Sequence, residues 1–367
     1  MDKQLKIIIS GGGTGGHIYP AVSIANALQQ KVENIDILFV GAQGRMEMEK
    51  VPAAGYKIVG LPVVGLQRRL TWKNLLLPFK LQKSLNLAKK ILKDFKPDVV
   101  VGVGGYASGP VLRKASKLKI PTLIQEQNSY AGITNKLLAK KARKICVAYE
   151  NMERFFPKEK IMLTGNPVRQ DLSNIHALKG EALNFFDLDT TKKTILLLGG
   201  SLGARTLNES ITNAFNTIEE SGYQLLWQTG KNYGDKAKQL VLDKNSNSIK
   251  AHDFIYRMDY AYAAADIVIS RAGAGTISEL CVVGKPCILV PSPNVAEDHQ
   301  TKNAQALVNK KAAIMVSDTD VEKKLLDTAL SLMKNEQQMA ELSDNISKLA
   351  MPNAANIIAD EVLKLVK

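Results

Sequence analysis

Four glycine-rich stretches follow apolar runs in this sequence, and the first of them ends in a histidine. That stretch, GGGTGGH, spans residues 11–17. A glycine-rich turn between a strand and a helix presents free backbone N–H groups and the positive end of the helix dipole, which together bind anions such as phosphate. The other three are GVGGYASGP at 102–110, GGSLGARTLNES at 199–210 and SRAGAGTISEL at 270–280. A tight turn explains any one of these loops as well as phosphate binding does, but the set of four favours phosphate binding.

The first loop contains the spacing GxGxxG, which is typical of dinucleotide-binding proteins. That fingerprint also needs an acidic residue about 20 positions further on, at the end of the second strand. Here the second apolar run ends FVGAQ, and its one acid, Asp36, stands at its start. The residue after Gly16 is His17 and not lysine, which excludes a Walker A loop. The sequence therefore argues against a nicotinamide, flavin or P-loop nucleotide site.

His17 is the candidate general base. It stands where a helix is expected to begin, and the positive end of a helix disfavours the imidazolium form. A neutral imidazole can accept a proton from a hydroxyl group. The alternative is that His17 only forms hydrogen bonds within the loop, and His299 is a weaker candidate for a contact with the ligand.

Two Asp-x-Asp sequences match a pattern of carboxylates that can bind a metal ion. They are Asp187 to Asp189 and Asp318 to Asp320, both within polar connecting stretches. We interpret both as solvated turns. Helix dipoles and backbone N–H groups can stabilise a diphosphate, so we expect neither a metal ion nor another cofactor.

Buried parallel strands are needed to position these loops. Apolar runs that predict such strands are separated by helical patterns at 6–10, 35–40, 98–103, 121–126, 144–149, 194–200, 223–230, 265–273 and 285–293. The unit of strand, glycine loop and helix at 7–25 recurs at 195–217. This repeat predicts two Rossmann-like, doubly wound α/β domains that face each other across a cleft.

Seven motifs in order resemble one known family. They are GGGTGGHIYPA, GVGGYASGP, EQNSYAGITNKLLA, GNPVR, GGSLGARTLN, RAGAGTISE and PSPNVAEDHQTKNA. Together they resemble the MurG family of bacterial N-acetylglucosaminyltransferases over essentially the full length. The resemblance implies a GT-B fold and transfer of GlcNAc from UDP-GlcNAc to the C4 hydroxyl of MurNAc in undecaprenyl-pyrophosphoryl-MurNAc-pentapeptide (lipid I). The product would be lipid II, with inversion to a β-1,4 linkage, in the peptidoglycan synthesis that supports cell shape and cell division.

The same resemblance implies domains and site residues. It assigns 1–165, with the C-terminal helix 352–367 packed back onto it, to the acceptor and membrane, and 166–351 to the UDP-GlcNAc donor. Implied donor contacts are Thr14, Gly15, Gly16, Asn128, Arg169, Ser201, Ile255, Ala274, Gly275, Thr276, Glu279 and Gln300. The resemblance places the first three of these at the acceptor phosphates as well. Among the donor contacts, Ser201 reaches the diphosphate, the Ile255 backbone meets the uracil, Glu279 takes the ribose hydroxyls and Gln300 reads the GlcNAc hydroxyls. Implied loops for the acceptor diphosphate contain Gly13, Gly104, Gly105, Tyr106 and Ser108. The chain departs from the family at Gln125, where a histidine is usual.

The excess positive charge lies in the first half of the chain. Residues 1–165 carry 27 Lys and Arg against 11 Asp and Glu, whereas the remainder carries 22 against 24. Within 66–96 and within 113–144, nine basic residues stand against one acid. Trp72, Leu75, Leu76 and Phe79 share one helical face, so the basic half suits an anionic lipid surface, although the apolar face is equally explained as core. The stretches lack a nucleic-acid-binding motif, so we expect no nucleic acid partner.

The sequence thus predicts a peripheral protein of the cytoplasmic face of the bacterial inner membrane. It shows no pattern of a secretory signal peptide and no apolar run long enough to span a bilayer. Expected partners are UDP-GlcNAc, lipid I, the anionic membrane surface and other proteins of cell-wall synthesis and division. The alternatives are another GT-B enzyme acting on UDP-GlcNAc, such as a 2-epimerase, and a non-catalytic protein that binds nucleotide sugars or phospholipids.

Overall fold

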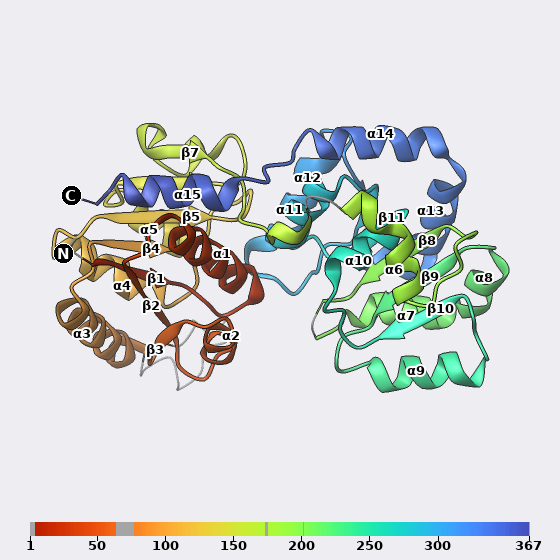
Figure 1. The fold of residues 1–367 in the computed structure, drawn as a ribbon, viewed down its shortest axis with the longest axis horizontal. Helices are drawn as coiled ribbons and strands as arrows, with labels where there is room; N and C mark the ends of the chain where they lie inside the picture. Colours follow the sequence, from red (N-terminus) through yellow and green to blue (C-terminus); the bar gives the residue numbers. More distant parts are fainter. Residues whose placement is uncertain (1–3, 64–76, 173–174, 201, 367) are drawn as a thin grey trace. The chain divides into compact units, whose positions relative to one another are not determined.

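Two parallel β-sheets organise the chain, one in each of two units. The computed structural model describes residues 4–63, 77–172, 175–200 and 202–366. The first unit contains residues 1–168 and 351–367, and the second contains residues 169–350 (Figure 1).

The sheet of the first unit has, within the described residues, seven strands in the order β3-β2-β1-β4-β5-β6-β7. The strands are β1 (Leu5–Ser10), β2 (Ile35–Ala42), β3 (Lys57–Leu61), β4 (Val99–Gly102), β5 (Thr122–Glu126), β6 (Lys144–Val147) and β7 (Ile161–Leu163). The helices are α1 (Gly15–Lys31), α2 (Glu47–Ala53), α3 (Leu77–Phe95), α4 (Ser108–Lys117), α5 (Ile133–Ala139) and α15 (Ala354–Leu363), with short 3₁₀ turns η2 (Met152–Arg154) and η3 (Lys158–Lys160). Helices α1 and α15 cover one face, and α3, α4 and α5 cover the other.

The C-terminal helix α15 packs against α1 in this unit (Figure 1). Its buried residues Ala355, Ile358, Ala359 and Val362 follow the spacing of one helical face and share a core cluster with the buried face of α1. Alanines at two of these four positions allow the helices to approach closely. The last residues of the chain therefore complete the core that begins at β1.

The sheet of the second unit has, within the described residues, six strands in the order β10-β9-β8-β11-β12-β13. The strands are β8 (Thr194–Leu198), β9 (Gln224–Gln228), β10 (Ile249–His252), β11 (Ile267–Ser270), β12 (Cys287–Leu289) and β13 (Ile314–Met315). The helices are α6 (Lys179–Phe185), α7 (Arg205–Asn213), α8 (Phe215–Glu220), α9 (Gly234–Asp243), α10 (Met258–Ala264), α11 (Ala274–Val283), α12 (His299–Val308), α13 (Val321–Lys334) and α14 (Glu336–Ser347). The 3₁₀ turns are η4 (Gln170–Leu172), η5 (Ile175–Leu178), η6 (Ala296–Asp298) and η7 (Asp318–Asp320).

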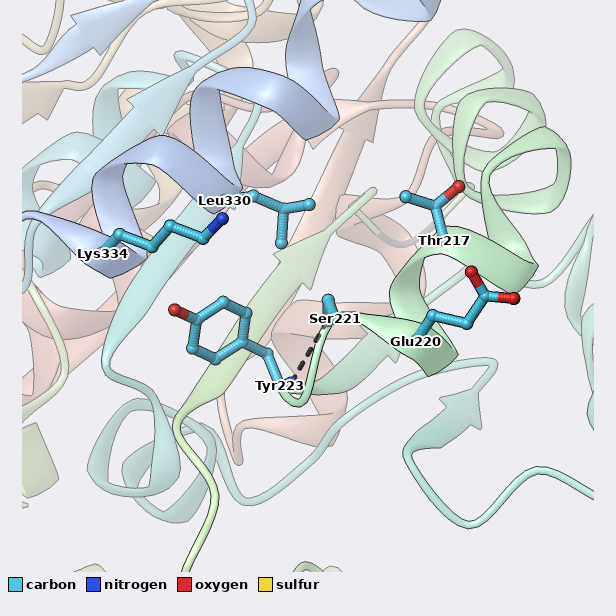
Figure 2. A pocket seen from close by; sticks show the side chains of 6 residues that line it. All are labelled: Thr217, Glu220, Ser221, Tyr223, Leu330 and Lys334. Atoms are coloured by element: carbon cyan, nitrogen blue, oxygen red, sulfur yellow. Dashed lines mark hydrogen bonds between the residues drawn. The ribbon is translucent and has the colours of Figure 1, made fainter.

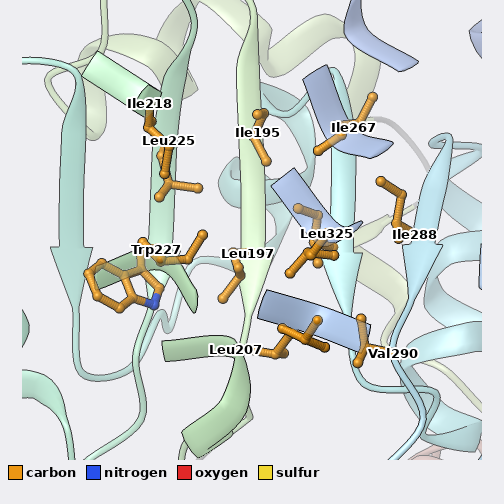
Figure 3. Packing of buried hydrophobic residues seen from close by; sticks show 14 of the residues in the cluster. Ile195, Leu197, Leu207, Ile218, Leu225, Trp227, Ile267, Ile288, Val290 and Leu325 are labelled. Carbon is orange, nitrogen blue, oxygen red and sulfur yellow. The ribbon is translucent and has the colours of Figure 1, made fainter. Parts of the chain in front are cut away.

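One face of this second sheet carries a large apolar core. Alternate residues of neighbouring strands, including Leu197 of β8 and Trp227 of β9, point into it, and Leu325 of α13 covers them (Figure 3). Trp227 is fully buried, and its indole N–H donates to Asn208 Oδ1 of α7 at 3.0 Å. This bond fixes the helix that follows the glycine loop against the strand beside it.

Both sheets reverse their strand order beside the first strand of the unit. In the first unit β1 pairs with β2 on one side and β4 on the other, with Ser10 opposite Gly102. In the second unit β8 lies between β9 and β11, with Leu198 opposite Ser270. Ligands of doubly wound sheets bind outside the carboxyl ends of the strands at such switch points. All four glycine-rich stretches start there.

Every strand expected from the apolar runs is present, and the doubly wound α/β class is confirmed. No helix among the described residues has the length and apolar character needed to cross a bilayer.

Candidate functional site

The two glycine loops of the first unit touch through their backbones. Gly105 has φ +81°, and a Cβ at that position would lie 2.4 Å from the carbonyl oxygen of Gly12. Such a distance is far inside van der Waals contact, so the close approach requires glycine. The loop after β1 and the loop after β4 therefore form one surface at the switch point.

His17 lies against this surface, in the first turn of α1. Its Nδ1 is 3.3 Å from the Thr14 hydroxyl, and a Cβ at Gly104 would lie 2.9 Å from its Nε2. When Nδ1 carries the ring proton and donates to Thr14, Nε2 carries none and can accept one from a substrate. The geometry thus gives the half-buried imidazole a defined orientation.

The backbone amides of the first loop do not all face the same way. Gly15 and Gly16 lie in the first turn of α1, where N–H groups point out of the helix end. The N–H of Gly13 instead donates to the carboxylate of Glu47 at 2.9 Å. Glu47 is buried, and the sequence analysis did not single it out.

The other loop residues differ in their exposure. Tyr106 is exposed, whereas Ser108 is fully buried and its hydroxyl donates to the carbonyl oxygen of Gly105 at 2.9 Å. Ser108 therefore closes the loop before α4.

A buried amide network connects the end of β5 to the second loop. Gln125 is fully buried, and its Nε2 donates to Asn166 Oδ1 at 2.9 Å. Gln127 donates to Gln125 and to the carbonyl oxygen of Val103, the latter at 2.7 Å. The position where the resembled family has a histidine thus lies inside the protein. There Gln125 supports Gln127, which lies near Gly104.

Asn128 is held by the carboxylate of Glu126. Glu126 accepts hydrogen bonds from the Asn128 N–H (3.1 Å), the Gly132 N–H (3.0 Å) and Asn135 Nδ2 (2.9 Å). Burial raises the pKa of Glu126 above its usual range, and these hydrogen bonds oppose the rise. The EQN motif marks this turn in the sequence, but it does not reveal the part played by Asn135.

In the second unit, Glu279 is oriented by two donors. Arg169 Nε donates to Oε1 at 3.1 Å, and the Tyr262 hydroxyl donates to Oε2 at 2.9 Å. Burial raises the pKa of Glu279, and both partners oppose that rise. Burial also raises the pKa of Tyr262 well above its usual value, so its hydroxyl keeps its proton and donates. Each oxygen of Glu279 retains a lone pair for a further donor.

The start of α11 presents unoccupied space. Ala274, Gly275 and Thr276 form its first turn, behind an N-cap glycine that makes no side-chain cap. A Cβ at Gly275 would meet no atom within 4 Å. The loop after β8 also begins at the switch point, but Ser201 lies outside the described residues.

Two more residues that are predicted to contact UDP-GlcNAc each have one hydrogen-bonding group already occupied within the protein. The N–H of Ile255, which is buried, donates to Gln228 Oε1 at 3.0 Å, so only the Ile255 carbonyl remains for a ligand. Gln300 Oε1 accepts the Ser292 N–H at 2.8 Å, which leaves the side-chain nitrogen as the donor.

One interpretation of the Asp-x-Asp sequences is wrong. Asp187 is exposed and pairs with Lys250, as expected for a solvated turn. Asp318, however, is mostly buried and forms an ion pair with Arg271. The Thr206 hydroxyl donates to Asp318 at 2.6 Å and accepts from Arg271 at 2.8 Å. Asp318 thus joins the loop after β11 to the start of α7, a cluster that no local sequence motif marks.

The described residues form no metal cluster, and the cavity shown in Figure 2 lies away from the glycine loops. Within the described part of the chain, no group of three or more His, Cys, Asp or Glu side chains is placed to hold a metal ion. A cavity of about 180 Å³ lies between α8 and α13, beside Tyr223 at the amino end of β9 (Figure 2). Leu330, Lys334 and Ser221 also line it. It opens at the opposite ends of the strands from the glycine loops.

Two parallel sheets with glycine loops at their switch points define the class of doubly wound α/β proteins. Family models agree. The glycosyltransferase family 28 N-terminal domain matches residues 7–147, and the glycosyltransferase family 28 C-terminal domain matches residues 194–358.

Curated relatives match the chain over its full length. A UDP-N-acetylglucosamine–N-acetylmuramyl-(pentapeptide) pyrophosphoryl-undecaprenol N-acetylglucosamine transferase of Phocaeicola vulgatus is 60% identical, covering 100% of this chain and 97% of the relative. The Flavobacterium psychrophilum protein of the same name is 55% identical, covering 100% and 99%. The chain therefore belongs to glycosyltransferase family 28, within the family of these N-acetylglucosamine transferases.

Solved structures agree with the fold. The crystal structure of MurG from Acinetobacter baumannii is 30% identical with a TM-score of 0.79, covering 98% of this chain and 99% of that one. A UDP-GlcNAc 2-epimerase from Neisseria meningitidis, bound to UDP-GlcNAc, is 16% identical with a TM-score of 0.66, covering 98% and 100%, and shares the fold alone. The fold is GT-B, as the sequence predicted.

Proposed function

We propose that this chain transfers GlcNAc from UDP-GlcNAc to the C4 hydroxyl of MurNAc in lipid I, with inversion to a β-1,4 linkage, and so makes lipid II for peptidoglycan. The observation that carries the proposal is full-length identity of 60% to a relative that bears the name of this transferase. Both substrates carry a diphosphate, which suits glycine loops and helix starts.

The second unit binds the donor in this proposal. Glu279, oriented by Arg169 and Tyr262, accepts the two ribose hydroxyls through its remaining lone pairs. The amides of Ala274, Gly275 and Thr276 and the dipole of α11 stabilise the diphosphate, both in the bound donor and in the departing UDP. Further roles follow the resemblance: the Ile255 carbonyl for the uracil, Gln300 for the GlcNAc hydroxyls and Ser201 for the diphosphate.

The first unit binds the acceptor and supplies the base. The attacking C4 hydroxyl must lose a proton as it bonds to the anomeric carbon, and His17 Nε2 takes that proton. Thr14 holds Nδ1 and so sets which ring nitrogen faces the substrate. The surface formed by the loops after β1 and β4 receives the acceptor diphosphate, with the amides of Gly15 and Gly16 pointing outward. The resemblance also assigns Asn128, in this unit, to the donor.

Membrane binding rests on the outer surface of the first unit. Phe79 on α3 and the pair Ile133 and Leu137 on α5 are 76%, 63% and 77% exposed. Helix α3 also carries five lysines and α5 carries Lys136, and apolar side chains together with lysines suit an anionic lipid interface. Leu85 and Leu92 of α3 are buried in the core, whereas Phe79, which belongs to the predicted apolar face, is exposed. Trp72, Leu75 and Leu76 lie outside the described residues.

Location and partners complete the proposal. A lipid-linked acceptor and a nucleotide-sugar donor meet at the cytoplasmic face of the inner membrane, where a peripheral protein reaches both. Proteins of cell-wall synthesis and division are the proposed protein partners there.

The test uses purified protein, UDP-GlcNAc and a short-chain lipid I analogue. UDP release and lipid-linked disaccharide are measured in the same reaction, with and without the analogue. The proposal expects UDP and disaccharide in equal amounts and only when the analogue is present. Epimerisation or hydrolysis of UDP-GlcNAc without disaccharide would contradict it, and so would donor binding without turnover.

A further inference from the structure

Glu47 is a buried carboxylate directly behind the first glycine loop. It stands in the first turn of α2, and only 1% of it is exposed. Its Oε1 accepts the N–H of Ala42 at 2.9 Å, and its Oε2 accepts the N–H of Gly13 at 2.9 Å. Both oxygens are therefore engaged by backbone, one at the end of β2 and one in the loop after β1.

The loop is shaped around this side chain. Gly12 has φ +144°, and a Cβ there would lie 2.2 Å from Glu47 Oε1. A Cβ at Gly41 in β2 would lie 2.6 Å from Glu47 Cγ. The Glu47 side chain thus fits only because positions 12 and 41 are both glycine, which indicates that its contact with the loop is not incidental.

Glu47 takes an N–H group that a glycine loop would otherwise offer to a phosphate. A carboxylate oxygen at Gly13 occupies the position of a ligand oxygen, and it also disfavours a second anion at that amide. The outward amides of Gly15 and Gly16 remain available to the acceptor. Thr14, which holds His17, follows Gly13 directly in the chain.

From this geometry we infer that Glu47 is a positioning residue for the transfer. It holds Gly12 and Gly13 in one conformation, so that Thr14 and His17 are in place before the acceptor binds, and it directs the acceptor diphosphate away from Gly13 to the start of α1. This inference rests on the proposed function. The proposed contacts of UDP with Glu279 and the start of α11 lie in the second unit, so we expect the affinity for UDP to be independent of Glu47.

The test compares Glu47→Gln with Glu49→Gln, a glutamate of the same helix whose side chain is 79% exposed. Glutamine keeps one accepting oxygen but turns an NH₂ group toward a backbone N–H donor. Relative to wild type, we expect Glu47→Gln to lower kcat/KM for the lipid I analogue about 10- to 100-fold, with the Kd of UDP within twofold. Rates are compared only after urea unfolding of both proteins shows that the first unit of the variant is folded under the assay conditions, so partial unfolding does not imitate the effect. Glu49→Gln behaves as wild type.

An unchanged kcat/KM, or an equal loss of UDP affinity, would overturn the inference. Should Glu47→Gln not fold, hydrogen exchange of ¹⁵N-glycine-labelled wild type decides the matter. The Gly13 amide should exchange much more slowly than those of Gly15 and Gly16, and equal rates would overturn the inference. If the wild type makes no disaccharide, the proposed function fails, while the exchange measurement still tests the role of Glu47 in the loop.

Discussion

Replacing Glu279 by glutamine tests how the second unit holds its nucleotide. The substitution keeps the shape of the side chain but exchanges one accepting oxygen for a donating NH₂ group. A hydrogen bond from a ribose hydroxyl to a charged carboxylate contributes about 1.5–3 kcal/mol, so the loss of one such bond weakens UDP binding about 10- to 150-fold. The cost in stability is about 1 kcal/mol, because Arg169 is 37% exposed and keeps the amide oxygen as its partner.

Isothermal titration calorimetry measures this effect with two ligands. UDP and 2′,3′-dideoxy-UDP share the base and the diphosphate but differ in the hydroxyls that Glu279 is proposed to bind. Glu279→Gln should weaken UDP binding and leave the binding of the dideoxy compound nearly unchanged. Glu336→Gln, which breaks an exposed ion pair with Lys193 in the same unit, serves as the control. Equal weakening for both ligands would refute the ribose assignment and would place the effect on the diphosphate or on folding.

Three further predictions concern the base, the loop contact and a buried lysine. His17→Ala should lower disaccharide formation by about 10²- to 10⁴-fold with an unchanged Kd for UDP, and unchanged turnover would leave His17 as a loop residue only. Gly105→Ala should lower the free energy of unfolding, measured in urea, by about 1–3 kcal/mol, because its Cβ would lie 2.4 Å from Gly12. The control is Gly180→Ala in α6, where a Cβ meets nothing within 4 Å, and it should raise the free energy of unfolding by about 0.5–1 kcal/mol. Burial lowers the pKa of Lys285 to about 8, so between pH 8 and 10.5 only the unfolded chain holds that proton, and this lysine alone adds up to about 3 kcal/mol to the free energy of unfolding as pH rises. Burial raises the pKa values of the thiols of Cys146, Cys281 and Cys287, which act in the opposite direction above about pH 9 in wild type and variant alike. In urea unfolding from pH 7 to 10, the stability of wild type should therefore rise relative to that of Lys285→Met, and a constant difference between the two would contradict the account.

The sequence predicted the central strands and missed the edges of both sheets. β3 and β7 are the edge strands of the first sheet, and β10 and β13 are the edge strands of the second. All four were missed, because an edge strand has a neighbour on one side only and stays partly exposed. A continuous apolar run is the signal of a strand buried on both faces, as in β4 and β8. Edge strands lack that signal.

The candidate site was predicted where its residues belong to a local motif, and missed where a partner is distant in the chain. The glycine loops can be recognised in the sequence by their composition. Glu47 acts on Gly13, 34 positions away, and Arg271 pairs with Asp318, 47 positions away. No local pattern reveals such a pair. Asp318 was assigned to a solvated turn because its sequence neighbours are polar, whereas the fold surrounds it with Thr206 and Arg271.

The measurement that tests the central claim most directly is a proton NMR spectrum of the product formed from UDP-GlcNAc and the lipid I analogue. The account predicts a GlcNAc residue bonded to the C4 oxygen of MurNAc, with the large anomeric coupling of a β linkage. An α linkage, attachment at another hydroxyl, or a spectrum that contains only epimerised or hydrolysed GlcNAc would contradict it.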